Sequence, residues 1–325
     1  MRTSVHFVRL SVLTCLLNLF TLHAKAQSFS FANGKIEVGV GIGPSFFLGD
    51  LGGSQGKGKT FVKDVDFPLT KLCKGIYINI YPAEWLGIRF AGNLGYLQGD
   101  DAQAPNKGGA ERFRLSRNLK FQSKLSEAYG AIEFYPTVFL EQYEGLQGKL
   151  RPYGLIGVGI FHFNPQGEYA APNGTKQWVD LKPLRLEGQG MAEYSNRSEY
   201  PLTQMMIPMG GGFKYYLKEN FYVGFEILHR KTFTDYIDDV STNYIDPRYF
   251  DQYLAPAQAA QARQLSYREN IYNPGVSRRY INLQRGDPKE NDAFFSGMLR
   301  LGYRVNGSNS PSGRAKRQLK CPVFY

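Results

Sequence analysis

The chain has 325 residues, of which 42% are apolar, and its formal net charge at pH 7 is +11. After residue 26 no apolar run approaches the roughly 18 residues of a membrane-spanning helix, which excludes that class for this part of the chain. Its strongest departure from an average soluble composition is a high aromatic content, with 22 Tyr and 23 Phe. Membrane β-barrels place such rings at both interfaces, but composition alone leaves a soluble β-sandwich open.

The first 26 residues have the pattern of a secretory signal peptide. A positively charged start precedes the largely apolar stretch 10–22, and Ala24 and Ala26 form a small-x-small cleavage site before Gln27. Cleavage after Ala26 would remove three positive charges and no negative ones, which leaves a mature net charge of +8. We therefore expect export of the mature chain.

Export narrows the classes of partner and of fold. Lipopolysaccharide phosphates, acidic partners or solubility alone would each account for the positive charge, whereas nucleic acid is not an expected partner. Without a helical anchor, an exported chain is either soluble outside the cytoplasm or a barrel, because only helices and closed barrels satisfy backbone groups in lipid. The strand pattern has to decide between the two.

Eight segments alternate between apolar and polar or small residues, as tilted membrane strands do. They are residues 35–48, 72–81, 88–96, 118–135, 150–163, 204–217, 221–233 and 293–305. In 118–135 the apolar parity shifts along the segment, which predicts a β-bulge or a misplaced end.

The connections between these segments alternate strictly between short and long. Bacterial outer-membrane barrels show this asymmetry, with short periplasmic turns and long extracellular loops. The sequence therefore predicts an all-β fold, an eight-stranded antiparallel up-and-down transmembrane β-barrel over 27–305, located in the cell outer membrane. Both barrel ends would face the periplasm, and 306–325 would form a basic periplasmic tail.

Side chains fill the interior of an eight-stranded barrel, so a solute channel is not expected. Charged residues at the inward positions of the predicted strands would have to pair with one another, because an isolated buried charge is costly. The predicted interior charges are Glu37, Arg89, Lys120, Lys124, Glu226, Arg300 and Arg304.

Residues that could carry chemistry each have a simpler interpretation. His162 and His229 share the parity of the lipid-facing residues, which favours interfacial packing over general-base catalysis. We expect no enzyme activity and no cofactor. Cys73 and Cys321 are an exported pair, but the topology puts them at opposite ends of the barrel, so no disulfide is expected.

Aspartates cluster at positions 235, 238, 239 and 246. Oxygen-rich loops can bind calcium, but the spacing matches no known ligand pattern and no Gly supplies the sharp turn. Solvated loop charges or local capping are the preferred interpretation, and no metal site is expected.

The connection 136–149 is long for a periplasmic turn and carries apolar residues at helical spacing. These residues are Phe139, Leu140, Tyr143 and Leu146. Two interpretations stay open, namely a short helix that plugs the base of the barrel and a docking surface for a periplasmic partner.

Several loop ends and strand junctions resemble the family of outer-membrane barrels that includes PorG, a component of the type IX secretion machinery. The matching stretches are 49–53 (Gly-Asp-Leu-Gly-Gly), 99–101 (Gly-Asp-Asp), 117–121 (Arg-Asn-Leu-Lys-Phe), 163–165 (Phe-Asn-Pro), 187–190 (Glu-Gly-Gln-Gly), 207–210 (Ile-Pro-Met-Gly) and, most specific, 231–241. Many lie where a strand meets an outer loop, so Arg-to-Asp or Arg-to-Glu pairing would fix the loops there.

This resemblance implies a non-enzymatic barrel that takes part in protein transport. Its partners would be the periplasmic ring of that machinery, formed by a lipoprotein and its soluble partner. Residues 249–291 and the basic tail depart from the family pattern. The alternative is a general membrane-stabilising or surface-adhesive barrel that acts through its outer loops.

Overall fold

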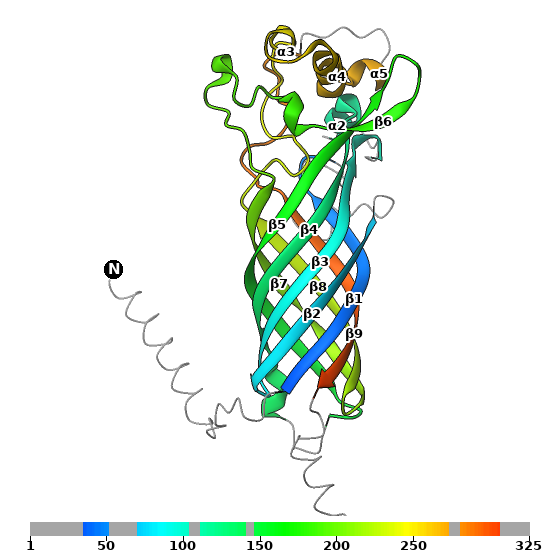
Figure 1. Cartoon of the computed structure of the whole chain (residues 1–325), viewed down its shortest axis with the longest axis vertical. Helices are drawn as coiled ribbons and strands as arrows, with labels where there is room; N and C mark the ends of the chain where they lie inside the picture. Colours follow the sequence, from blue (N-terminus) through cyan, green and yellow to red (C-terminus); the bar gives the residue numbers. More distant parts are fainter. Residues whose placement is uncertain (1–34, 52–69, 104–110, 141–145, 273–279, 306–325) are drawn as a thin grey trace, which may run out of the picture.

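Eight antiparallel strands close into a barrel in this computed structural model, which describes residues 35–51, 70–103, 111–140, 146–272 and 280–305. The strands are β1 (Lys35–Leu48), β2 (Lys71–Ala83), β3 (Leu86–Asp100), β4 (Lys120–Phe134), β5 (Leu150–Ala170), β7 (Thr203–Lys218), β8 (Phe221–Thr232) and β9 (Ala293–Val305). Each pairs with the next along the chain, apart from the short β6, and β9 pairs with β1 to close the ring (Figure 1). The predicted up-and-down barrel is confirmed.

The outer surface of the barrel is apolar and its interior is polar, the reverse of a soluble protein. On β1, Val38 and Val40 are 39% and 52% exposed, while Glu37 between the same strand's apolar residues is fully buried. Ile76 on β2 and Leu299 on β9 are more than 60% exposed. Such a surface is stable in lipid and not in water, so the barrel spans a membrane, and a barrel of this architecture belongs to the outer membrane. No helix among the described residues is long and apolar enough to cross a membrane.

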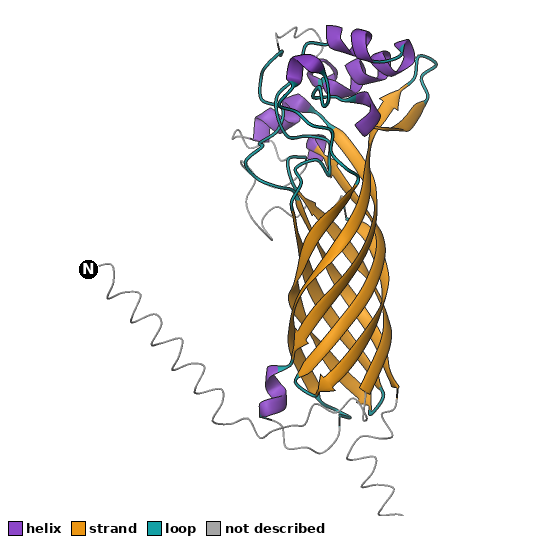
Figure 2. Ribbon diagram, turned by 60° about the vertical axis from the view of Figure 1, so that its left-hand side comes forward, coloured by secondary structure: helices purple, strands orange, loops and turns teal. Residues whose placement is uncertain are grey.

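The two ends of the barrel differ. The short β2–β3 and β7–β8 turns lie at the end where β1 begins and β9 ends, which is the periplasmic end (Figures 1 and 2). The 3₁₀ turn η5 (Pro136–Phe139) lies at the same end. The described parts of the long connections lie at the opposite, outer end.

The long connections fold into a layer over the outer end, here called the outer cap, which comprises the described residues of 101–119, 171–202 and 233–292. Strand β5 extends beyond the barrel and pairs with β6 (Lys176–Asp180). The cap also contains α2 (Glu111–Arg117), α3 (Arg248–Tyr253), α4 (Pro256–Ser266), α5 (Glu269–Tyr272), η4 (Asp101–Gln103), η6 (Lys182–Leu184) and η7 (Ala192–Tyr194). Its core contains buried Leu184, Phe250, Ala262 and Leu265.

Strand β4 corrects the predicted parity. Its pairing with β3 and with β5 runs without interruption, so of the two predicted alternatives the bulge is wrong, and the strand begins at Lys120, two residues later than predicted. Phe121 and Leu125 point inward and are buried, whereas Lys120 and Lys124 point outward. The prediction that these two lysines lie in the interior is therefore wrong. The physical reason is the outer cap, which covers the upper lumen and allows an apolar core to form there. In this core the ring centroids of Phe121 and Phe47 are 4.8 Å apart.

Candidate functional site

The lowest level of the barrel interior is organised by Glu37 on β1. Its carboxylate accepts hydrogen bonds from Lys214 Nζ (2.8 Å), from the Tyr81 hydroxyl (2.6 Å) and from the Tyr216 hydroxyl (2.9 Å). Arg304 on β9 lies 3.9 Å from the same carboxylate. A buried carboxylate that is paired and hydrogen-bonded in this way leaves no uncompensated charge in the lumen.

The middle level is centred on Glu226 of β8, which two guanidinium groups share. Arg89 on β3 and Arg300 on β9 each form an ion pair with it, and the Tyr153 hydroxyl donates a hydrogen bond at 2.6 Å. Arg89 also pairs with Glu133 on β4. Side chains from opposite walls therefore meet in the middle of the barrel and fill it.

The upper level holds a third buried pair. Arg230 on β8 bonds both carboxylate oxygens of Glu127 on β4, and its Nη1 donates to Ser296 Oγ at 2.5 Å. The Asn93 amide donates to the same carboxylate at 2.5 Å. Such two-pronged Arg–carboxylate contacts are strong and directional. In the part of the chain that the structure describes, the lumen is thus crossed by polar contacts at three levels.

The structure buries in the lumen those predicted interior charges that lie on β1, β3, β8 and β9, namely Glu37, Arg89, Glu226, Arg300 and Arg304. Further lumen charges were not predicted: Glu127, Glu133, Arg151, Lys214 and Arg230. Arg230 has the same strand parity as Glu226 and was available to sequence analysis. Glu127 was missed because the parity of the first part of β4 was assigned wrongly. Glu133 alternates with the outward-facing Ile132 and Phe134 and was available to sequence analysis.

At the outer mouth, Arg117 at the end of α2 joins three outer connections. Its Nε and Nη2 donate to the two carboxylate oxygens of Asp101, at 2.8 and 2.9 Å. Nη2 also donates to the Asp50 carbonyl (2.5 Å), and Nη1 donates to the Arg285 carbonyl (2.6 Å). One side chain therefore ties together the loops that follow β1, β3 and β8.

Glu187 joins the remaining outer connection to the same network. It is fully buried and accepts backbone N–H groups of Ser241 (3.0 Å) and Thr242 (2.9 Å). Arg285 Nη1 donates to it at 2.8 Å and also bonds the Asp239 carbonyl. We call the contacts made by Arg117, Glu187 and Arg285 the mouth network.

Two aspartates of the mouth, one of them from the predicted cluster, act as backbone caps. Asp238 accepts the Leu51 N–H (3.0 Å) and the Val240 N–H (2.9 Å), and Asp292 accepts the Ile237 N–H (2.8 Å). Asp238 is fully buried, so the interpretation of solvated loop charges is wrong for this residue, whereas local capping is what the structure shows.

Burial makes these carboxyl groups weak acids. Loss of solvation, with a smaller contribution from Asp238, raises the pKa of Asp235 to about 9. Burial likewise raises the pKa of Asp239 to about 7, although Arg285 and the Tyr200 hydroxyl oppose the shift. By contrast, Asp246 lies nearer the surface, where Arg248 Nη2 bonds it at 2.6 Å.

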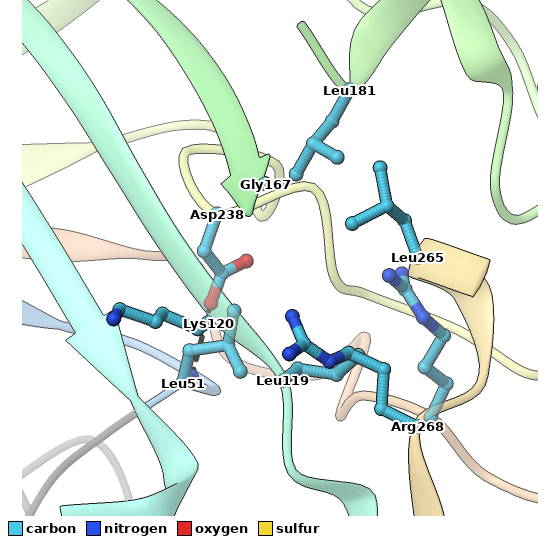
Figure 3. Close-up of a pocket in the computed structure, with 9 residues that line it drawn as sticks. Leu51, Leu119, Lys120, Gly167, Leu181, Asp238, Leu265 and Arg268 are labelled. Atoms are coloured by element: carbon cyan, nitrogen blue, oxygen red, sulfur yellow. Dashed lines mark hydrogen bonds between the residues drawn. The ribbon is translucent and has the colours of Figure 1, made fainter. Parts of the chain in front are cut away.

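A small cavity lies where the cap meets the barrel. Its volume is about 10 Å³, room for about one water molecule. Leu119, Leu181 and Leu265 line it together with Arg268, which follows α4, and with Asp238 (Figure 3). The cavity is too small to bind an organic ligand.

At the periplasmic end the structure describes residues 136–140 and 146–149 of the connection 136–149. Phe139 lies outside the barrel, with its ring 6.1 Å from Trp85 and 6.2 Å from Phe134. Leu140 is 86% exposed. Leu146 is buried, and its N–H bonds the Glu219 carboxylate. Within these described residues, the 3₁₀ turn that starts at Pro136 lies outside the barrel and does not fill its base.

Some predicted residues lie outside the described part of the chain. They are Ala24, Ala26, Gln27, Tyr143, Cys321 and the tail 306–325. Cys73 is a buried free thiol.

The two histidines lie on outward-facing positions of their strands. His162 is exposed on β5, where its Nδ1 lies 3.0 Å from the Thr203 hydroxyl oxygen. His229 is only partly buried on β8. The structure brings neither of them to the mouth network or to the lumen.

No protein-family model matches the chain, and no curated protein matches it. Among solved structures, the chain is similar to Ail of Yersinia pestis, at 9% identity and a TM-score of 0.33, over 84% of this chain and 97% of that one. It is similar to OprG of Pseudomonas aeruginosa at 10% identity and a TM-score of 0.35, over 84% and 96% of the two chains. A major outer-membrane protein of Thermus thermophilus matches at 10% identity and a TM-score of 0.37, over 84% and 99%. At this level of similarity, the fold assignment rests on the strand pairing itself.

Proposed function

We propose that the chain is a non-enzymatic structural or assembly component of the type IX protein secretion machinery, which contacts a periplasmic ring. The observation that carries the proposal is the mouth network. Four of the stretches that resemble the PorG family meet in it, because Asp50, Asp101, Arg117 and Glu187 belong to 49–53, 99–101, 117–121 and 187–190. A further resembling stretch, 231–241, supplies the backbone groups that Glu187 and Arg285 bind.

A filled lumen supports a scaffold role. Glu226 on β8 binds Arg89 on β3 and Arg300 on β9, so described side chains cross the lumen at a level where a conduit would need open space. We propose that transported proteins pass elsewhere in the machinery and that this barrel holds components in place.

The periplasmic end offers a surface for such a role. Phe139 and Leu140 are 60% and 86% exposed in a connection that emerges from the barrel base. The Phe139 ring also packs beside Trp85 and Phe134, so these residues form a contiguous apolar patch, and such patches mark contact sites. We propose that they contact the lipoprotein or the soluble partner of the ring, beside the aromatic residues Trp85 and Phe134, which lie at the level of the membrane interface.

Co-purification of the full tagged chain from detergent extracts tests this function. We expect the wild type to recover ring components, and we expect the Phe139→Ser/Leu140→Ser double variant to recover far fewer. Leu283→Ser is the matched control, because Leu283 is also an exposed apolar residue but lies in the outer cap. The proposal is wrong if the wild type recovers no ring component and deletion of the chain leaves secretion unchanged.

The outer cap supports a second candidate, a membrane-stabilising or adhesive barrel. Its helices pack around buried Leu184, Phe250 and Leu265, so the long loops form an ordered surface. Replacing the cap segments 171–202 and 233–292 with short loops distinguishes the two functions. Adhesion would be lost with the cap, whereas recovery of ring components would persist.

A further inference from the structure

Two outward-facing lysines on the barrel wall form no ion pair with a described residue. Lys74 on β2 and Lys124 on β4 are exposed, and both point away from the lumen. Within the described ranges neither amine takes part in an ion pair. Lys120, four residues nearer the cap on the same strand as Lys124, differs, since its amine lies 3.8 Å from Asp100 and 3.7 Å from Glu168.

The strand register places the two amines on one patch of the wall. Lys74 pairs with Leu94, and Leu94 pairs with Ser126, so Lys124 lies two strands across and two residues further toward the outer end. With strands about 4.8 Å apart and about 3.3 Å per residue, the two Cα atoms are about 12 Å apart. Tyr96, directly opposite Lys124, lies between them and is 46% exposed. Two long, flexible lysine side chains can converge on one group at this spacing.

The surroundings place this patch at the outer edge of the apolar band. Ile76 and Leu94 next to it are exposed apolar residues, whereas Gln98 and Gln122 lie above it, toward the cap. No acidic residue occupies an outward-facing position of β2, of β3 up to Gln98, or of β4 beyond Lys120. An unpaired amine is costly in hydrocarbon and favourable at headgroup level, where it can snorkel toward phosphate.

We propose that Lys74, Lys124 and Tyr96 form a binding site for the phosphate of an outer-leaflet lipid. The two amines would bind the phosphate oxygens, the Tyr96 ring would lie at headgroup level, and Leu94 and Ile76 would contact the acyl chains. This inference does not depend on the proposed role in secretion, because it concerns a different face of the molecule.

Native mass spectrometry of the full chain in detergent, titrated with lipid A, tests the site. We expect phosphorylated lipid A to bind and enzymatically dephosphorylated lipid A to bind much more weakly. A lysine near an anionic headgroup contributes about fivefold in affinity, so Lys74→Gln/Lys124→Gln should weaken binding about 25-fold. Lys120→Gln should have no effect, and Lys74→Arg/Lys124→Arg should retain binding.

Three outcomes would overturn the proposal. One is equal binding of the two lipid A forms to the wild type, a comparison that needs no variant to fold. Another is unchanged affinity of the double Gln variant. A third is complete displacement of the lipid by inorganic phosphate, which would assign the amines to a free anion and not to a lipid.

Discussion

Glu226 is shared by two buried guanidinium groups in the middle of the lumen. Arg89 and Arg300 are both ion-paired with it, and Arg89 also pairs with Glu133. A buried ion pair adds little net stability compared with apolar packing, but the loss of one partner leaves a buried charge without compensation. Removal of the Glu226 charge alone should therefore destabilise the protein, because its buried partners would lose their counter-charge.

We predict that Glu226→Gln lowers the free energy of unfolding by about 3–5 kcal/mol. Urea unfolding of the refolded barrel in detergent measures the effect. Glu290→Gln removes the same charge from an exposed cap position and should leave the unfolding midpoint unchanged. If the two variants were equally stable, the three-level arrangement of lumen charges would be wrong.

Arg117 has the corresponding role at the mouth. Its planar guanidinium binds Asp101 with two nitrogens and also two backbone carbonyls, a geometry that a lysine amine cannot reproduce. We predict that Arg117→Lys makes the cap more sensitive to limited proteolysis by about tenfold, since a net loss of about 1.5 kcal/mol is typical of charged hydrogen bonds. Arg112→Lys, at an exposed position of the same helix, is the control.

Some elements were predicted accurately from the sequence and others were not. Strands β1 and β9 match their predicted bounds, because the alternation of Ile36 to Ile42 and of Phe295 to Tyr303 has one apolar face throughout. The parity of β4 was wrong, because Phe121 and Leu125 belong to an apolar core that exists only once the cap is folded.

Cap elements were not predicted, for a related reason. Helix α4 buries small residues such as Ala259 and Ala262, which give little periodic contrast in the sequence. The end of β5 and all of β6 depend on pairing with each other and not on a pattern of their own. The mouth network joins residues from connections far apart in the chain, so sequence analysis could name its Arg-to-acid chemistry but not its partners.

The pKa values of the mouth carboxyls predict how the cap responds to pH. Because folding raises the pKa of Asp239 to about 7 and of Asp235 to about 9, their contribution to stability is fully present below about pH 4. It is lost as pH rises through 7 and then 9. We predict that backbone amides of the cap exchange hydrogen more readily at pH 9 than the intrinsic rate increase explains.

Asp235→Asn tests this explanation, because an amide resembles the protonated carboxyl. The variant should lose part of the pH dependence while amides in the barrel strands remain unaffected. Cap protection that grows with rising pH would contradict the assignment.

At the scale of the whole molecule, the fold follows from an inverted distribution of polarity. Apolar side chains such as Ile76 and Leu299 face outward, while Glu37, Arg89 and Glu226 are paired inside. Every barrel strand has two neighbours, so no backbone edge is left for lipid to meet. Closure of the barrel, its apolar exterior and its filled lumen therefore depend on one another and form a single structural property.

Electrophoresis of the outer-membrane fraction, with and without boiling, tests this property most directly. A closed barrel resists detergent at room temperature, so we predict that the unboiled chain migrates as a compact species, clearly separated from the boiled one. Identical mobility of the two samples, from a protein that purifies without detergent, would contradict a membrane-spanning barrel.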